Sequence, residues 1–200
     1  MYKNFTFLLA ASVVAFMGKF AQADVTLPSI IGNGMVLQQQ MAAPIWGWAD
    51  PGESITVSFE KQSKSATADD NGKWMIKLDP IKANSEGQDL EIKGKNTITL
   101  EEVLVGEVWI CSGQSNMTHY FGRHQERYAK EIAEANIPEI RQFYVPTKAV
   151  LSGPQNDYQG LKWEEANPES LLKFTVIGYF FAKKLYDEYK IPMGIINTCV

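Results

Sequence analysis

The chain has 200 residues, of which 45% are hydrophobic and 21% are charged. This composition is that of ordinary globular protein and excludes a disordered chain, which needs lower hydrophobicity and higher net charge. The formal net charge of −4, without a cluster of lysine and arginine, argues against a nucleic-acid partner.

Residues 1–23 carry the features of a secretory signal peptide. Lys3 gives a positive start, residues 5–17 form an apolar run, and Ala21-Gln-Ala23 is a cleavage site of the small-x-small type. The apolar run is short for a membrane span, so we expect no span after cleavage. The sequence therefore predicts a mature chain that starts at Asp24 and is exported to the periplasm or the extracellular space.

Residues 24–103 predict an all-β domain. Stretches with strand character alternate with turns rich in glycine, proline and asparagine, which is typical of a β-sandwich, here jelly-roll-like. We expect strands over Met35–Gln39, Ile45–Ala49, Ser54–Phe59, Lys73–Leu78, Leu90–Lys93 and Thr97–Leu100. Such a domain either binds carbohydrate or is a structural partner. We favour the structural role, because a fold alone does not establish a function.

Residues 104–200 predict an α/β domain, since strands now alternate with helices. Apolar strands are expected at Val108–Cys111, Ile140–Val145 and Gly194–Val200, and a helix at His124–Ala135. This alternation builds a parallel sheet with helices on its faces, an α/β/α arrangement.

A second helix is expected to begin at Asn167-Pro-Glu-Ser170 and to end near Tyr189, before Pro192. Asparagine is a good N-cap, proline suits the first turn, and glutamate suits the positive end of the helix. Side chains at helical spacing should face the sheet: Leu172, Val176, Tyr179, Phe180 and Leu185.

The turn after the first of these strands holds the candidate nucleophile, Ser115. A serine that follows a buried strand and opens a helix is where hydrolases place a nucleophile, and ligands of parallel sheets bind beyond the carboxyl ends of the strands. Gly113 permits a sharp turn with space for a substrate carbonyl, and the N–H of Ser115 would stabilise an oxyanion. The alternative is an ordinary helix cap, and Met117 breaks the pattern G-x-S-x-G.

The neighbours of this serine have weaker assignments. Gln114 either shapes the pocket or is a solvated turn residue, and Asn116 either caps the helix or holds the loop. His119 and His124 are the only histidines of the sequence, and histidines so close to Ser115 in the chain seldom reach it as a general base, so a surface or substrate-lining role is favoured over that of the base. Paired carboxylates such as Glu101-Glu102 and Glu164-Glu165 suggest a solvated surface rather than a glycosidase site.

Two cysteines, Cys111 and Cys199, lie in apolar stretches near the ends of two predicted strands. A disulfide is an option in an exported protein, but bridges between neighbouring strands are strained, so we expect buried free thiols. Neither cysteine has metal-ligand spacing to a histidine, so we expect no metal and no cofactor.

Several blocks of this sequence resemble the sialate O-acetylesterase family of secreted carbohydrate esterases, a branch of the SGNH (GDSL-like) hydrolases. The nucleophile block is Val108-Trp-Ile-Cys-Ser-Gly-Gln-Ser-Asn-Met117. In the same order as in the family, the other blocks are Met35-Val-Leu-Gln38, Ile45-Trp-Gly-Trp-Ala-Asp-Pro-Gly-Glu53, Asp70-Asn-Gly-Lys-Trp74 and Val103-Leu-Val-Gly-Glu-Val-Trp109. The resemblance covers nearly all of the chain after residue 23.

The resemblance implies that Ser115 attacks an acetyl ester. It also implies that the Ser115 N–H, a later glycine and a later asparagine form the oxyanion hole, and that a distant Asp-x-x-His segment supplies the base. These later elements would lie beyond Val200, so we expect the chain to be the N-terminal part of a longer enzyme, inactive by itself.

Three functions follow. The first is a secreted serine esterase that removes O-acetyl groups from a sugar, above all sialic acid. The second is an esterase for acetylated polysaccharide such as xylan, because related families share the block Gly113-Gln-Ser-Asn-Met117. The third is a non-catalytic glycan-binding protein that kept the fold.

Overall fold

The computed structural model describes residues 24–200, and the predicted signal peptide at residues 1–23 lies outside the described residues. In chain order the strands are β1 (Val36–Gln38), β2 (Ala43–Trp48), β3 (Ser54–Phe59), β4 (Gln62–Thr67), β5 (Lys73–Leu78), β6 (Asn84–Lys93), β7 (Thr97–Cys111), β8 (Ile137–Tyr144), β9 (Trp163–Ala166) and β10 (Met193–Asn197). The helices are α1 (Ser115–Thr118), α2 (Ala129–Glu134) and α3 (Val176–Tyr189), with short 3-10 helices η1 (Phe121–Arg123) and η2 (Ser170–Lys173).

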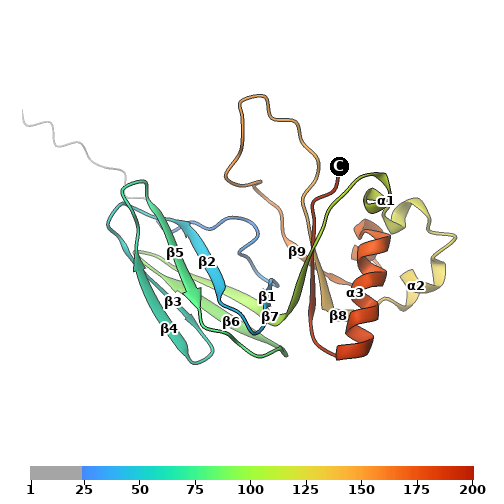
Figure 1. Ribbon diagram of the computed structural model, residues 1–200, viewed down its shortest axis with the longest axis horizontal. Helices are drawn as coiled ribbons and strands as arrows, with labels where there is room; N and C mark the ends of the chain where they lie inside the picture. Colours follow the sequence, from blue (N-terminus) through green and yellow to red (C-terminus); the bar gives the residue numbers. More distant parts are fainter. Residues whose placement is uncertain (1–23) are drawn as a thin grey trace, which may run out of the picture.

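Most of the strands belong to one large mixed sheet. It is 8-stranded, with the order β4-β3-β6-β7-β10-β8-β9 and with β1 paired to β7, while β2 and β5 form a separate 2-stranded sheet. Figure 1 shows a β-rich half and a half with helices, which β7 connects. The prediction of a chain that mixes α and β structure is therefore confirmed.

The β-rich half encloses its own apolar core. Residues alternate along β3 and β5, so that Ile55, Val57 and Ile76 are buried while their neighbours face water. Ile45 of β2 joins the same cluster, so both sheets contribute to one core. The strands predicted at Ser54–Phe59 and Lys73–Leu78 are found with those bounds.

Strand β7 passes from one half of the molecule to the other without a break. Val103 and Val105 pair with β6, and Glu107–Cys111 pairs with β10. At the crossing, a Cβ on Gly106 would lie 2.0 Å from the Pro192 carbonyl oxygen, so only glycine permits this close approach. The domain boundary predicted between residues 103 and 104 falls inside this strand.

The second half contains the predicted parallel sheet. β10 lies between β7 and β8 and is parallel to both, with Ile195 opposite Trp109 and Gln142. Helix α3 covers one face, where Tyr179 packs in one buried cluster with Ile195. β9 was not predicted; it adds an antiparallel edge to β8.

Both predicted helices are shorter than expected. The stretch predicted at His124–Ala135 is helical only over α2, because η1 and the turn after it place Tyr128 against Phe121 instead of continuing a helix. Within residues 24–200, no helix is long and apolar enough to cross a membrane.

The long helix begins at Val176 rather than at Asn167. The Asn167 side chain caps η2 by accepting hydrogen bonds from the N–H groups of Glu169 and Ser170, at 3.0 and 2.9 Å. The chain then extends, and Thr175 becomes the N-cap of α3. Phe180, predicted to face the sheet, is 37% exposed and packs instead beside Phe121.

Candidate active site

Ser115 opens helix α1 directly after β7, as predicted. The strand end that leads to it is not buried as expected, because Trp109 is 41% exposed and Ile110 is 71% exposed. Trp109 packs edge-on against Phe181 of α3, and Ile110, the next residue along the strand, points to the opposite face of the sheet. The end of β7 that leads to Ser115 therefore carries exposed apolar side chains within residues 24–200.

Hydrogen bonds from two directions hold the serine turn. On the β10 side, the N–H of Val200 donates to the Gly113 carbonyl at 3.0 Å, and that of Thr198 donates to the Cys111 carbonyl at 2.9 Å. On the α3 side, the Thr175 hydroxyl donates to the Met117 carbonyl at 2.8 Å. These bonds fix the backbone on both sides of Ser115.

Gly113 adopts a φ of +139°, a backbone angle that L-residues with a side chain rarely adopt. A Cβ built on Gly113 would meet no atom nearer than Met117 Cβ at 3.9 Å. Open space therefore lies beside the turn, and the glycine is required by its backbone angle rather than by crowding.

Two backbone donors at the start of α1 are free. Met117 and Thr118 donate their N–H groups to the Gln114 carbonyl, whereas those of Ser115 and Asn116 donate to no acceptor within residues 24–200. α1 has four residues, so these local N–H groups matter more than any dipole of a long helix. They can donate to a developing oxyanion.

A crevice of about 360 Å³ opens beside α1, beyond the carboxyl ends of β8 and β10. Its lining consists of Thr118, Tyr120, Tyr144, Lys173, Asn197 and Cys199. Tyr144 ends β8 and Asn197 ends β10. The crevice therefore has the position that ligands take in sheets of this kind.

The inner wall of the crevice is buried and neutral. Asn197 and Cys199 are each 3% exposed, and the Cys199 thiol donates to the Asn197 Oδ1 at 2.8 Å. Burial raises the pKa of the Cys199 thiol. Burial, and to a lesser degree the nearby Cys199, raises the pKa of Cys111. Both cysteines are buried free thiols, and both stay protonated at neutral pH.

Lys173 lines both this crevice and a second pocket, in which its ammonium lies 3.6 Å from the Glu164 carboxylate. Its side chain is 67% exposed, so this ion pair is weak and leaves the charge accessible.

The two histidines contact each other. His124 Nε2 lies 3.1 Å from His119 Nδ1, and the rings are stacked with 5.1 Å between their centroids. Ser115 Oγ has no hydrogen-bonding partner among residues 24–200, and neither histidine lies within hydrogen-bond distance of it. Gln114 and Asn116 are both exposed beside the serine, in positions where they could contact a ligand.

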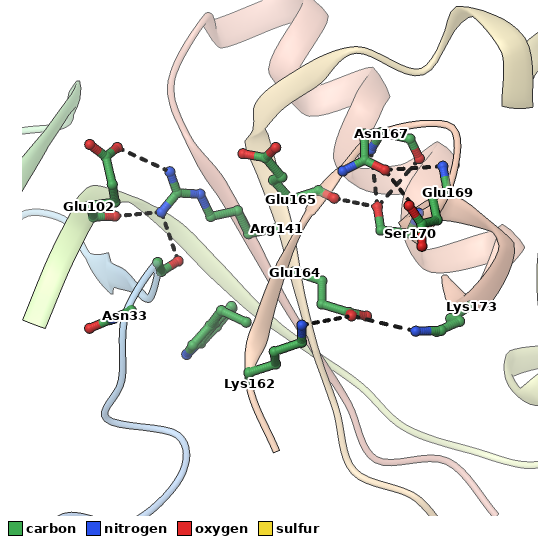
Figure 2. A pocket seen from close by; sticks show the side chains of 12 residues that line it. Asn33, Glu102, Arg141, Lys162, Glu164, Glu165, Asn167, Glu169, Ser170 and Lys173 are labelled. Carbon is green, nitrogen blue, oxygen red and sulfur yellow. Dashed lines mark hydrogen bonds and ion pairs between the residues drawn. The ribbon is translucent and has the colours of Figure 1, made fainter. Parts of the chain in front are cut away.

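A second, polar pocket of about 530 Å³ lies where the two halves of the molecule meet (Figure 2). The buried Arg141 guanidinium donates to the carbonyls of Gly34, Glu102 and Pro138. Opposite charges are already paired in this pocket, with Glu164 near both Lys162 and Lys173. These contacts connect the two halves of the molecule at this pocket.

The sequence did not predict Tyr120, Tyr144, Lys173 or Asn197 as site residues. Two of them could have been found, because Tyr144 and Asn197 end predicted strands of a parallel sheet, where ligands bind. Tyr120 and Lys173 arrive from irregular segments, and no local pattern marks them.

The comparisons with known proteins agree with this arrangement. No protein-family model matches the chain. A solved structure of a carbohydrate acetylesterase from Xanthomonas citri superposes with a TM-score of 0.81 and 34% identity, over 88% of this chain and 40% of that one. The fold of this chain is therefore similar to that of part of a carbohydrate acetylesterase.

Curated relatives indicate more closely which class of acetylesterase the chain resembles. Sialate O-acetylesterases from Pongo abelii and Homo sapiens are 29% and 28% identical to the chain, over 95% of its length. The chain spans 40% of the length of each of these two relatives. It is thus a sialate O-acetylesterase-like chain, and the resemblance predicted from its motifs is confirmed.

Proposed function

We propose that this protein is a carboxylic ester hydrolase, a secreted serine esterase that removes O-acetyl groups from sugars, with sialic acid as its foremost substrate. The observation that carries the proposal is the position of Ser115, beside two free backbone N–H groups, on a short helix whose last residue, Thr118, lines a crevice at the carboxyl ends of parallel strands. The names of the similar proteins support the same chemistry. The proposal includes a fold assignment, in which a jelly-roll-like β-sandwich is followed by an SGNH-like domain.

In this mechanism Ser115 Oγ attacks the acetyl carbonyl carbon, and the C=O electrons move to the oxygen. The Ser115 N–H donates to that oxyanion, while Gln114 and Asn116 shape the pocket around it. The tetrahedral species then expels the sugar hydroxyl and leaves an acetyl ester on Ser115. Water hydrolyses this ester to acetate and restores the serine.

Ser115 requires a base that takes its proton and returns it to the sugar oxygen. Because the two histidines of residues 24–200 bond to each other rather than to Ser115, we place this base, with further oxyanion donors, in a segment outside these residues. The chain by itself should then have little activity, since one oxyanion donor alone is worth about 2.7–4 kcal/mol.

The crevice supports an acidic sugar. Sialic acid carries a carboxylate, and Lys173, a lining residue of the crevice, has an exposed ammonium that lies 3.6 Å from the Glu164 carboxylate. Acetylated xylan lacks that charge. The comparison of turnover on O-acetylated sialic acid and on acetyl-xylan separates the two substrates, and Lys173→Met should reduce turnover of the acidic sugar alone.

Single serine substitutions in the full-length protein test whether Ser115 is the nucleophile. Ser115→Ala should abolish release of acetate and leave the melting temperature nearly unchanged, because its hydroxyl is exposed and makes no hydrogen bond within residues 24–200. Ser112→Ala is the matched control and should keep turnover. Near-normal turnover by Ser115→Ala would contradict the assignment. If binding of a glycan persisted without any turnover in the unmodified protein, the non-catalytic glycan-binding protein would be the better description.

Export is part of the proposal and rests on residues 1–23. Mass spectrometry of the secreted protein should show Asp24 at its N-terminus. An intact Met1 on a cytoplasmic product would contradict it.

A further inference from the structure

A groove of about 400 Å³ lies on the β-rich half of the molecule, over strands β2 and β5. Its lining includes Trp46, Trp48, Asp69, Lys73, Met75 and Asn156. None of these residues lines the crevice beside Ser115, so the groove is a separate site.

Strand alternation explains why large side chains gather in this groove. Ile45, Gly47 and Ile76 point into the core, and the residues between them point outward. Trp46 stands opposite Met75, and Trp48 stands opposite Lys73. The outer face of this 2-stranded sheet thus presents two indole rings and a methionine beside a lysine.

This outer face is unusual for a solvated sheet. Met75 is 54% exposed, and Trp46 and Trp48 are each only partly buried. Clustered exposed apolar side chains beside polar ones mark binding surfaces more often than plain surface.

Trp74 stands opposite Gly47 and belongs to the apolar core beneath this outer face. It is among the lining residues of the groove, but its side chain is 3% exposed and points to the core side of the sheet. The binding surface is therefore formed by the residues on the outer face.

We propose that this groove binds a sugar unit of a glycan. A pyranose has a face of C–H groups, which packs against an indole ring, and a rim of hydroxyls, which needs donors and acceptors around it. Trp46 and Trp48 provide the rings. Asp69, Lys73 and Asn156 provide polar groups of both kinds at the edge.

The groove is linked to the crevice through one loop. Asn156 belongs to the segment that leaves β8 after Tyr144, which lines the crevice, and returns to β9. Asp157, next to Asn156, accepts hydrogen bonds from the N–H and the hydroxyl of Ser29, at 3.1 Å each. These bonds hold Asn156 against the β-rich half, at the edge of the groove.

The choice of a glycan rests in part on the proposed function, so the test measures binding separately from turnover. Isothermal titration calorimetry of the Ser115→Ala protein with sialyllactose and with xylohexaose gives a dissociation constant for an acidic and for a neutral glycan. We expect one of these probes to bind. Trp48→Ala and Asn156→Ala should each weaken that binding, the tryptophan change by at least about tenfold, which is about 1.4 kcal/mol.

Tyr189→Ala is the matched control, because this tyrosine is 62% exposed at the far end of α3 and should leave binding unchanged. If Trp48→Ala does not fold, as judged by circular dichroism, Asn156→Ala decides the question. The proposal is overturned if neither probe binds, or if a folded groove variant binds as tightly as its parent. If the unmodified protein releases acetate but the groove variants bind glycan as tightly as their parent, this inference alone is contradicted. If the glycan binds in the groove but the unmodified protein releases no acetate, the proposed esterase alone is contradicted.

Discussion

The Thr175 hydroxyl donates a hydrogen bond to the Met117 carbonyl at 2.8 Å, so the N-cap of α3 also anchors the serine helix α1. Thr175 is 1% exposed, and its oxygen also accepts the N–H of Gly178. One buried side chain therefore satisfies the start of one helix and fixes the position of another.

Thr175→Val should destabilise the fold and reduce deacetylation. The valine keeps the shape but loses the cap, worth about 1 kcal/mol, and leaves the Met117 carbonyl without its donor. We expect the free energy of unfolding to fall by about 2 kcal/mol in urea titrations. Thr175→Ser keeps the hydroxyl and is the control; equal losses in both variants would show that the methyl group matters instead.

Gly113→Ala should reduce the release of acetate by more than its loss of stability alone would explain. A side chain at a φ of +139° costs about 1–3 kcal/mol, and the strain falls on the backbone beside the nucleophile. Gly153→Ala is a matched control, because Gly153 also has a positive φ of +110° and no atom near a Cβ, but it lies in a loop. Thermal melts should show similar losses of stability, whereas release of acetate should fall only for Gly113→Ala.

Arg141→Met should strongly destabilise the junction of the two halves. The guanidinium is 6% exposed and donates to three backbone carbonyls, which the methionine would leave unsatisfied. We expect a loss of about 3 kcal/mol or more in the free energy of unfolding. Glu102→Gln should change little, because that carboxylate is 72% exposed and lies 4.0 Å away. A large effect of Glu102→Gln would show that the ion pair, rather than the hydrogen bonds, stabilises this junction.

Cys111 and Cys199 should resist alkylation in the native protein. Burial raises the pKa of both thiols, so little thiolate forms at mildly alkaline pH. Because the native state holds these protons more tightly than the unfolded chain, the associated stability is present below the ordinary thiol pKa. It is lost as the pH rises through the raised pKa. Mass spectrometry should show iodoacetamide adducts only after denaturation; rapid labelling of the native protein would contradict this.

The sequence predicted those elements whose local pattern agrees with their environment. β3 and β5 alternate apolar and polar residues, and the fold buries that same alternate set. Ser115 could be placed because a strand, a glycine turn and a helix start follow one another within a few residues. The parallel arrangement of β7, β8 and β10 followed from the alternation of strands and helices.

Other elements depend on contacts that no local pattern contains. β4 reads Gln62-Ser-Lys-Ser-Ala-Thr67 and lacks an apolar stripe, because it is an edge strand whose serines bond to Thr56 and Ser58 across the ladder. The start of α3 was misplaced because Asn167 and Thr175 are both good caps, and packing decides which of them begins the long helix. The crevice residues converge from distant segments, which only the folded chain brings together.

The continuity of β7 bears on how this protein can move. A rotation of the β-rich half against the other half would have to break the ladder of β7 with β6 or with β10. The two halves thus share one continuous strand, Thr97–Cys111. Motion that changes the shape of the crevice without breaking these ladders falls to the loops that follow β7 and β8.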